Sequence, residues 1–249
     1  MGFWPVTKKV VKESDILLLI ADVRMPESSR NRELERMVKF HGKRIIYVFN
    51  KIDIVSPKYF DFVKERYPGA FFVSGVKNIG INELKRSLLI LAKRMKIKDP
   101  RIGVVGYPNT GKSAVINAIA KRARAKVSAK AGTTKGIQWI KVGGLLIMDS
   151  PGVVPFRDNE LMLGVMGAKN IEKIRNVERI AYEVLKMLIV YDKKVIEDCY
   201  GITIDGKDQG KILEEIGRKR NFLLKGGIID ERRAALLIVK DWHQGKLRF

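Results

Sequence analysis

Apolar residues in the first 150 positions form continuous runs that alternate with stretches of helical spacing. Continuous apolar runs are typical of strands that are covered on both faces. We expect six strands, at residues 15–22, 43–49, 70–73, 101–105, 136–142 and 145–148. Helical patterns lie between them, at residues 7–13, 31–41, 57–66, 82–96 and 114–120. This alternation predicts an α/β fold with a doubly wound, mostly parallel six-stranded sheet, and Gly143-Gly144 predicts a hairpin between its last two strands.

The pattern changes after about residue 160. Apolar residues from Ile171 to Leu188 recur at spacings of three and four, which predicts one amphipathic helix. Two further helices are expected at residues 208–220 and 230–244, with Asp230 as N-cap. We therefore expect two domains, an α/β domain over residues 1–160 and a small all-α domain over residues 161–249.

Charge is the most informative part of the composition. The 249 residues include 49 Lys and Arg but 27 Asp and Glu, so the formal net charge is +22. A thermophile's ion-pair networks would raise both signs together, so this excess of bases favours a polyanionic partner such as nucleic acid. No apolar run approaches the roughly twenty residues of a membrane span, and residues 1–15 do not resemble a secretory signal. We expect a cytoplasmic protein with no membrane partner.

Residues 106–113 read Gly-Tyr-Pro-Asn-Thr-Gly-Lys-Ser, which fits the phosphate-binding loop Gly-x-x-x-x-Gly-Lys-Ser. A predicted strand precedes it and a helical stretch follows, as the motif requires. Lys112 would reach the outer phosphates, and the Ser113 hydroxyl would hold magnesium. The alternative is a glycine-rich turn between a strand and a helix.

Two further motifs suit the reading of a base. Asn50-Lys51-Ile52-Asp53 follows the second predicted strand. The Asp53 carboxylate can accept hydrogen bonds from guanine N1–H and its 2-amino group, which adenine does not offer. Lys51 can lie along the base, and Asn50 can tie this loop to the phosphate loop; the alternative is a capped turn. Ser74-Gly75 follows the third strand, where a backbone N–H can meet guanine O6.

The remaining motif residues suit the γ-phosphate and its metal ion. Asp149 begins Asp-Ser-Pro-Gly152, in which the carboxylate would act on magnesium through water and the Gly152 N–H would contact the γ-phosphate. Thr134, or less favourably Thr133, can bind magnesium when the γ-phosphate is present. The alternative for either threonine is a turn or a strand start.

Together these motifs form the complete set of a GTPase, but in an unusual order. The base-reading motifs precede the phosphate-reading ones, and a circular permutation explains this, with residues 96–100 joining the ordinary ends. The expected catalytic residues are Lys112, Thr134 and Gly152. The expected GTP-binding residues are Asn50, Lys51, Asp53, Ser74, Gly75, Asn109, Thr110, Gly111, Lys112, Ser113, Ala114 and Gly152.

The motif order resembles that of the circularly permuted GTPases of ribosome assembly, the YlqF/YawG type. Residues 21–26 (Ala-Asp-Val-Arg-x-Pro), 215–220 and 225–227 add to the resemblance, which covers nearly the whole chain. It implies a GTP-hydrolysing assembly factor that binds the large ribosomal subunit or its precursor. Bacterial relatives carry a histidine just after the Trp-x-Pro region, but Val6-Thr7 follow Phe3-Trp4-Pro5 here, so no such catalytic role is carried over.

Val153 and Val154 follow Gly152 and cannot orient an attacking water by hydrogen bonding. We therefore expect slow intrinsic turnover that the ribosome or an ion raises. GTPases of similar pattern hold potassium with a phosphate-loop asparagine, which is Asn109 here; the alternative is a simple turn residue. The expected cofactors are GTP, GDP, Mg²⁺ (Ser113, Thr134, Asp149) and K⁺ (Asn109).

The all-α domain carries a basic cluster that suits rRNA phosphates. Its members are Arg218, Lys219, Arg220, Lys225, Arg232 and Arg233. Cations that complete a helix C-terminus explain one or two of these bases, but not a cluster that continues beyond it. An assembly GTPase, acting as a monomer, is the main hypothesis. An rRNA-binding scaffold with a vestigial GTP site is the alternative, and the charge argues against a small signalling GTPase.

Overall fold

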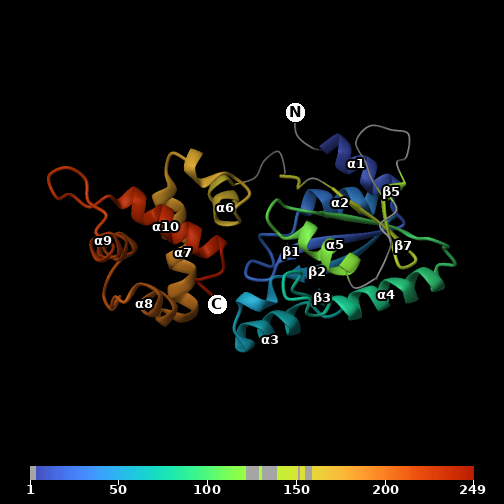
Figure 1. Ribbon diagram of the computed structural model, residues 1–249, viewed down its shortest axis with the longest axis horizontal. Coiled ribbons are helices and arrows are strands. Elements are labelled where there is room, and N and C mark those ends of the chain that lie inside the picture. The colour runs from blue at the N-terminus through green and yellow to red at the C-terminus, as the bar shows by residue number, and fades with distance from the viewer. Residues whose placement is uncertain (1–3, 122–128, 131–138, 151, 155–158) are drawn as a thin grey trace. The chain divides into compact units, whose positions relative to one another are not determined.

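The computed structural model describes residues 4–121, 129–130, 139–150, 152–154 and 159–249 (Figure 1). The chain divides into two compact units, residues 1–156 and 157–249. The first unit contains the sheet, and the second is built from helices. No helix in the described ranges is long and apolar enough to span a bilayer.

A seven-stranded sheet forms the centre of the first unit. Its strands are β1 (Ile16–Asp22), β2 (Arg44–Asn50), β3 (Phe71–Phe72), β4 (Arg101–Gly106), β5 (Ala129–Lys130), β6 (Trp139–Val142) and β7 (Leu145–Asp149). Their spatial order is β3-β2-β1-β4-β7-β6-β5. Pairing is parallel from β3 to β7 and antiparallel at β6 and β5.

The mostly parallel α/β fold is confirmed, and all six predicted strands are present. The predicted number of strands needs a correction, because the two-residue β5 adds a seventh at the edge next to β6. Such a short strand has no apolar run to mark it in the sequence. The predicted hairpin is also present: Gly143 and Gly144 have φ values of 52° and 86° and join β6 to β7.

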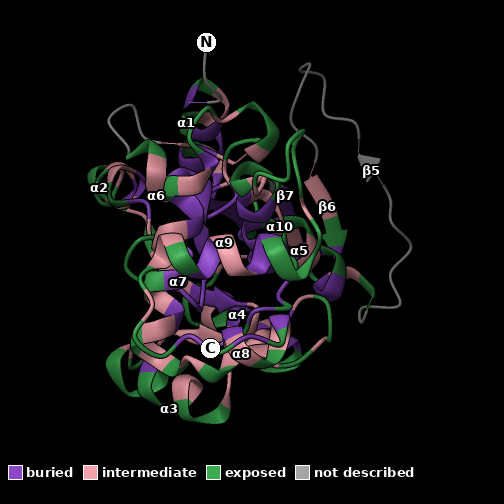
Figure 2. Cartoon of the chain, turned by 90° about the vertical axis from the view of Figure 1, so that its left-hand side faces the viewer, coloured by how far each residue is buried: buried purple, intermediate pink, exposed green. Residues whose placement is uncertain are grey.

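Helices cover both faces of the sheet, which explains the unbroken apolar run of β1. They are α1 (Trp4–Glu13), α2 (Arg32–Phe40), α3 (Pro57–Arg66), α4 (Ile81–Arg94) and α5 (Lys112–Lys121), with the short 3-10 helix η1 (Ile52–Ile54) after β2. Ile16, Leu18 and Ile20 pack into one core with α4 and α5. The alternate residues of β1 pack into a second core with α1, α2 and α3. Figure 2 colours the residues by burial: exposed and intermediate residues (green and pink) make up most of α3, and buried residues (purple) lie deeper in the view.

The second unit contains five α-helices and a 3-10 turn within the described residues. They are α6 (Glu160–Val165), η2 (Ile171–Lys173), α7 (Val177–Asp192), α8 (Lys194–Tyr200), α9 (Gln209–Lys219) and α10 (Glu231–His243). The Asp230 side chain accepts a hydrogen bond from the Arg233 N–H, so the predicted N-cap is confirmed. The fully buried Trp242 donates its indole N–H to the Val165 carbonyl, 2.9 Å away, and so links α10 to α6.

The prediction of a single helix from Ile171 to Leu188 is wrong. Asn170 caps the three-residue turn η2 by accepting from the Glu172 N–H, and the chain then becomes extended at Ile174, with ψ 127°. The helix α7 begins only at Val177. Apolar residues keep their spacing of three and four across this break, so periodicity alone does not reveal it.

Candidate functional site

The predicted nucleotide motifs meet at one edge of the sheet. β2 ends at Asn50, β4 at Gly106 and β7 at Asp149, and these strands run parallel. Ser74 and Gly75 follow β3 at the same edge. Carboxyl ends of parallel strands are where open α/β sheets bind ligands. The fold therefore brings together motifs that the sequence presents in a permuted order.

The phosphate loop curls around the Lys112 ammonium. Lys112 is only 7% exposed, and its Nζ donates to the carbonyl oxygens of Tyr107 (2.8 Å) and Gly106 (3.4 Å). The Thr110 hydroxyl donates to the same Tyr107 carbonyl at 2.9 Å. Gly106 has a φ of 150°, and a Cβ there would lie 2.4 Å from the Ile20 carbonyl oxygen, so only glycine fits. These contacts tie the Lys112 and Thr110 side chains to the backbone of the loop.

Two loop residues predicted to contact ions lie at the surface of this loop. Asn109 is exposed and has a left-handed backbone, with φ 59°. Ser113 is exposed in the first turn of α5, which begins at Lys112. The positive end of the α5 dipole therefore lies at the loop, where it favours an anion such as phosphate.

Asn50 joins the base-reading motifs to the phosphate loop. Its Nδ2 donates to the Thr110 carbonyl at 2.9 Å, so the predicted tie is present, and its Oδ1 accepts from the Gly75 N–H at 3.0 Å. Both glycines beside it are required by space. A Cβ at Gly111 would lie 2.2 Å from Asn50 Nδ2, and one at Gly75 would lie 2.8 Å from the backbone carbon of Ala114. The buried Asn50 side chain thus fixes three motifs in one arrangement.

The residues predicted to read the base follow Asn50 in a tight turn. Lys51 is left-handed with φ 73°, and η1 places Asp53 directly after it. The Asp53 carboxylate is half-buried and makes no hydrogen bond or ion pair with another described residue. A half-buried carboxylate acceptor in the turn that follows Asn50 suits the two donors of a guanine edge.

Sequence reasoning gave no role to Asp22, which holds Lys51, or to Arg24, which pairs with Asp22. Asp22, at the end of β1, accepts from Lys51 Nζ and from Arg24 Nη2, each at 2.8 Å. Its other oxygen accepts from the Arg24 backbone N–H (3.0 Å) and Nε (3.1 Å). The Asp22 and Arg24 side chains are 3% and 1% exposed. The Asp-x-Arg pattern after a buried strand was visible in the sequence, but its pairing with a residue 29 positions away was not.

Charge decides the ionisation of Asp22. Burial opposes the charged carboxylate, but the neighbouring Arg24 and Lys51 cations outweigh burial and hold the pKa of Asp22 well below its usual range. Asp22 is therefore an anion at neutral pH, and it keeps the Lys51 ammonium at the edge of the base-reading turn.

The segment after β7 packs closely on the phosphate loop. A Cβ at Gly152 would lie 2.6 Å from the Pro108 backbone nitrogen, so only glycine permits this approach. The Val153 N–H donates to the Gly106 carbonyl at 3.2 Å. The Val153 carbonyl accepts from the buried Asn31 side chain at 3.2 Å, and the Val154 carbonyl accepts from the Trp4 indole at 3.0 Å. Residues near the start of the chain thus fix the segment that was predicted to sense the γ-phosphate.

Part of the predicted metal site lies outside the described residues. The parts outside the description are Thr133, Thr134 and the side chain of Asp149; the backbone of Asp149 is described and ends β7. In the described part of the chain, no group of three or more His, Cys, Asp or Glu could hold a metal ion. The predicted donors are two hydroxyls and a carboxylate, which are the oxygen ligands that magnesium prefers when it also binds phosphate. The exposed Ser113 hydroxyl fits that use.

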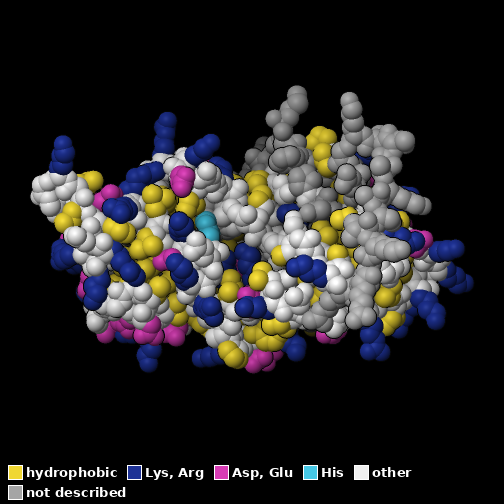
Figure 3. Space-filling view, in the orientation of Figure 1, with side chains coloured by type: hydrophobic (Ala, Val, Ile, Leu, Met, Phe, Trp, Pro, Cys, Tyr) yellow, Lys and Arg dark blue, Asp and Glu magenta, His cyan; other side chains and the backbone are white. Residues whose placement is uncertain are grey.

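The six predicted RNA-binding cations are all exposed, but they differ in their contacts. Arg218 pairs with Glu214 at 2.7 Å, and the Arg233 guanidinium lies 4.3 Å from the centre of the Phe222 ring. Arg220 lies over the Tyr200 ring at 5.9 Å. Lys219 and Lys225 form no ion pair with another described residue. Figure 3 shows Lys and Arg side chains over much of this unit, interspersed with apolar ones.

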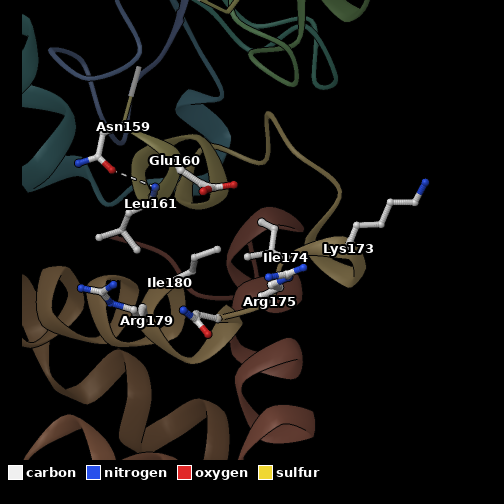
Figure 4. Close-up of a pocket in the computed structure, with 9 residues that line it drawn as sticks. Asn159, Glu160, Leu161, Lys173, Ile174, Arg175, Arg179 and Ile180 are labelled. Atoms are coloured by element: carbon white, nitrogen blue, oxygen red, sulfur yellow. Dashed lines mark hydrogen bonds between the residues drawn. The ribbon is translucent and has the colours of Figure 1, made fainter. Parts of the chain in front are cut away.

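Arg232 has a structural role that sequence reasoning did not foresee. Its guanidinium donates to the carbonyl oxygens of Arg175 (2.9 Å) and Ile174 (3.1 Å), and so braces the extended segment between η2 and α7. This segment borders a cavity of about 660 Å³ (Figure 4). Three cations that the sequence did not single out line the cavity: Lys173, Arg175 and Arg179. They widen the basic surface of the second unit beyond the predicted cluster.

Comparisons with known proteins agree with this geometry. A family model described as 50S ribosome-binding GTPase matches residues 101–224. A GTP-binding protein of Methanocaldococcus jannaschii is 37% identical over 98% of this chain and 65% of its own length. Nucleolar GTP-binding protein 2 of Saccharomyces cerevisiae is 32% identical over 98% of this chain and 52% of its own length. The chain therefore spans about half to two thirds of these relatives.

Solved structures show the same fold. GDP-bound YlqF superposes with a TM-score of 0.63 at 24% identity, covering 97% of this chain and 95% of that chain. GNP-bound YlqF from T. maritima gives 0.62 at 23% identity, covering 98% and 94%. The phosphate loop, the base-reading turn bound to it by Asn50 and the permuted motif order agree with these matches. Residues 101–224 thus match the 50S ribosome-binding GTPase family, and the chain has the circularly permuted GTPase fold of YlqF.

Proposed function

We propose that the first unit binds GTP and GDP and hydrolyses GTP, and that the second unit binds rRNA of the large ribosomal subunit or its precursor. The domains of this proposal are residues 1–160 and 161–249. The observation that carries the nucleotide part is the Asn50 side chain, which bonds to both the phosphate loop and the 74–75 loop. Only a ligand with a phosphate end and a base end uses both loops together.

Guanine selectivity rests on Asp53 in this proposal. Calorimetry would compare GDP and GTP with ADP and ATP for the parent chain and for Asp53→Asn. We expect strong preference for guanine nucleotides and a loss of about 2 kcal/mol in GTP binding for the variant, the scale of a hydrogen bond to a charged group. Equal affinity of the parent chain for ATP and GTP would overturn the assignment.

Hydrolysis in this proposal relies on positioning and charge. Lys112 and the Gly152 N–H stabilise the γ-phosphate, while Ser113, Thr134 and Asp149 hold magnesium, which neutralises charge on the phosphates. Val153 and Val154 offer no side-chain hydrogen bond to water, so the intrinsic rate is slow and ribosome binding raises it. Lys112→Ala should abolish turnover.

Potassium is the proposed activating ion, bound with the help of Asn109. The supporting observation is the exposed, left-handed position of Asn109 within the phosphate loop. GTP turnover should rise when K⁺ replaces Na⁺ at constant ionic strength, and Asn109→Ala should remove the difference. Identical rates in the two salts across a titration would exclude this role.

The ribosomal part rests on charge and on the relatives. The family model is described as ribosome-binding, relatives carry nucleolar names, and the net charge of +22 suits RNA. Co-sedimentation with large subunits across a salt series tests it. Neutralising Arg218, Lys219 and Arg220 together should weaken binding and flatten its salt dependence, while GDP binding stays unchanged.

The alternative is an rRNA-binding scaffold with a vestigial nucleotide site. The ordered contacts of Lys112 in the phosphate loop favour the enzyme. Measuring release from the ribosome distinguishes the two functions. Release of a scaffold does not depend on GTP hydrolysis, so Lys112→Ala would leave it unchanged. In the main proposal the chain acts as a cytoplasmic monomer, which analytical ultracentrifugation and cell fractionation would test.

A further inference from the structure

The loop between α9 and α10 is a hairpin that presents apolar side chains to solvent. We call residues 222–229 the apolar hairpin. Leu223, Leu224 and Ile228 are 47%, 54% and 65% exposed. The hairpin forms the left end of the ribbon in Figure 1, and apolar and basic side chains gather at that end in Figure 3. Exposed apolar groups in such a cluster mark an interaction site more often than isolated ones do.

The base of the apolar hairpin is held firmly. The Asp230 N–H donates to the Phe222 carbonyl and the Leu224 N–H donates to the Ile228 carbonyl, each at 2.8 Å. Ile229 packs on Gly217 of α9 so closely that a Cβ there would lie 2.5 Å from its Cγ2. The exposed side chains therefore project from a fixed support, with Gly226 and Gly227 forming the tip at φ values of 85° and 77°.

Cations surround the apolar side chains. Lys225 lies between Leu224 and Ile228 in the sequence, and Arg233 stacks on the Phe222 ring at the hairpin base. Lys219 and Arg220 end the preceding helix and are exposed. A surface that combines apolar side chains with this much positive charge suits a ligand with both apolar faces and negative groups. Nucleic acid has both, in its bases and its phosphates.

We propose that the apolar hairpin inserts Leu224 and Ile228 against unstacked bases of rRNA while the flanking cations bind the adjacent phosphates. Leucine and isoleucine gain nothing from a phosphate, but apolar side chains pack on exposed base faces and wedge between bases. This inference rests on the proposed rRNA binding of the second unit and adds a contact that is independent of charge.

The test separates the apolar from the electrostatic contribution. Binding of the full chain to protein-free large-subunit rRNA is measured across a salt series for the parent and for Leu224→Ser combined with Ile228→Ser. We expect affinity to fall about tenfold at every salt concentration, with an unchanged slope of log K against log salt, because buried apolar area is lost but no cation is. Lys225→Ser should instead lower the slope by about 0.7–0.9.

Val190→Ser is the matched control, since Val190 is 83% exposed on α7 in the same unit and outside the hairpin. It should leave binding unchanged, and all variants should keep the parent GDP affinity. Parent-like rRNA affinity of the double serine variant overturns the inference and leaves the proposed rRNA binding standing. No rRNA binding by the parent chain overturns both. If the double serine variant binds intact subunits more weakly but binds bare rRNA like the parent, the hairpin contacts a ribosomal protein, and the inference is again overturned.

A second variant reports the contact directly. Ile228→Trp places an indole at the most exposed of the three apolar positions, where it can stack on a base. Quenching of its emission on addition of rRNA, beyond that of the parent chain, is the expected result. Emission that matches the parent's response overturns the inference.

Discussion

Asp22→Asn tests how the buried charges support the base-reading turn. The carboxylate accepts four hydrogen bonds from Arg24 and Lys51, at 2.8 to 3.1 Å. Asparagine offers one oxygen instead of two, and it removes the negative charge that faces the Arg24 guanidinium. The Lys51 side chain is 20% exposed and can turn towards water, whereas Arg24 at 1% cannot. Most of the cost therefore arises at Arg24.

Leaving one member of a buried ion pair alone costs about 3–5 kcal/mol. Native-state hydrogen exchange of β1 amides measures this, because the central strand opens only when the first unit unfolds. Glu35→Gln is the control: the Arg30–Glu35 pair is also bidentate, but its side chains are 22% and 18% exposed, so we expect a loss of about 1 kcal/mol. If Asp22→Asn costs no more than Glu35→Gln, the reasoning is wrong.

The same substitution has a defined pH dependence. The pKa of Asp22 is lowered in the folded chain, so its stabilisation is complete above the unfolded-state value of about 3.9 and is lost as the pH falls towards the folded value. The stability difference between parent and Asp22→Asn should therefore stay constant from pH 8 to pH 5 and shrink only below about pH 4. A difference that shrinks between pH 7 and pH 5 would assign the effect to another group.

Three further substitutions test other contacts. Gly75→Ala forces a Cβ to within 2.8 Å of the α5 backbone, so the affinity for GDP, measured by calorimetry, should fall at least tenfold. Gly210→Ala is the control and should leave that affinity unchanged, because its Cβ would lie 3.5 Å from the nearest atom, Asp208 Oδ1. Arg232→Ala should lower the stability of the second unit by about 1–2 kcal/mol in hydrogen exchange, because two backbone carbonyls lose their donor; a loss as small as that of Lys225→Ala would contradict the bracing role. Asn31→Asp keeps the N-cap acceptor of α2 but removes the donor to the segment after β7, whose amides should then exchange faster; unchanged exchange would show that this hydrogen bond does not hold the segment.

Features that depend on residues close together in the sequence were predictable. The seven buried residues of β1 follow from an unbroken apolar run, and the start of α10 follows from Asp230. The break before α7 was not predictable, because Ile174 keeps the apolar spacing although its backbone is extended. The partners of Arg232 were equally hidden, since they are backbone carbonyls about 60 positions away and carry no residue signature.

The permuted order has a physical consequence for the segment after β7. In this chain the segment leads to the second unit, which begins at residue 157, only five positions beyond Gly152. The same few residues contact the phosphate loop, through the Gly106 carbonyl and the Pro108 backbone, and are held by the side chains of Asn31 and Trp4. In the proposed function, a shift of Gly152 towards a γ-phosphate would therefore strain the hydrogen bonds at residues 153 and 154. Because so little chain separates these contacts from the second unit, we propose that their rearrangement would be the route by which bound nucleotide influences the helical unit.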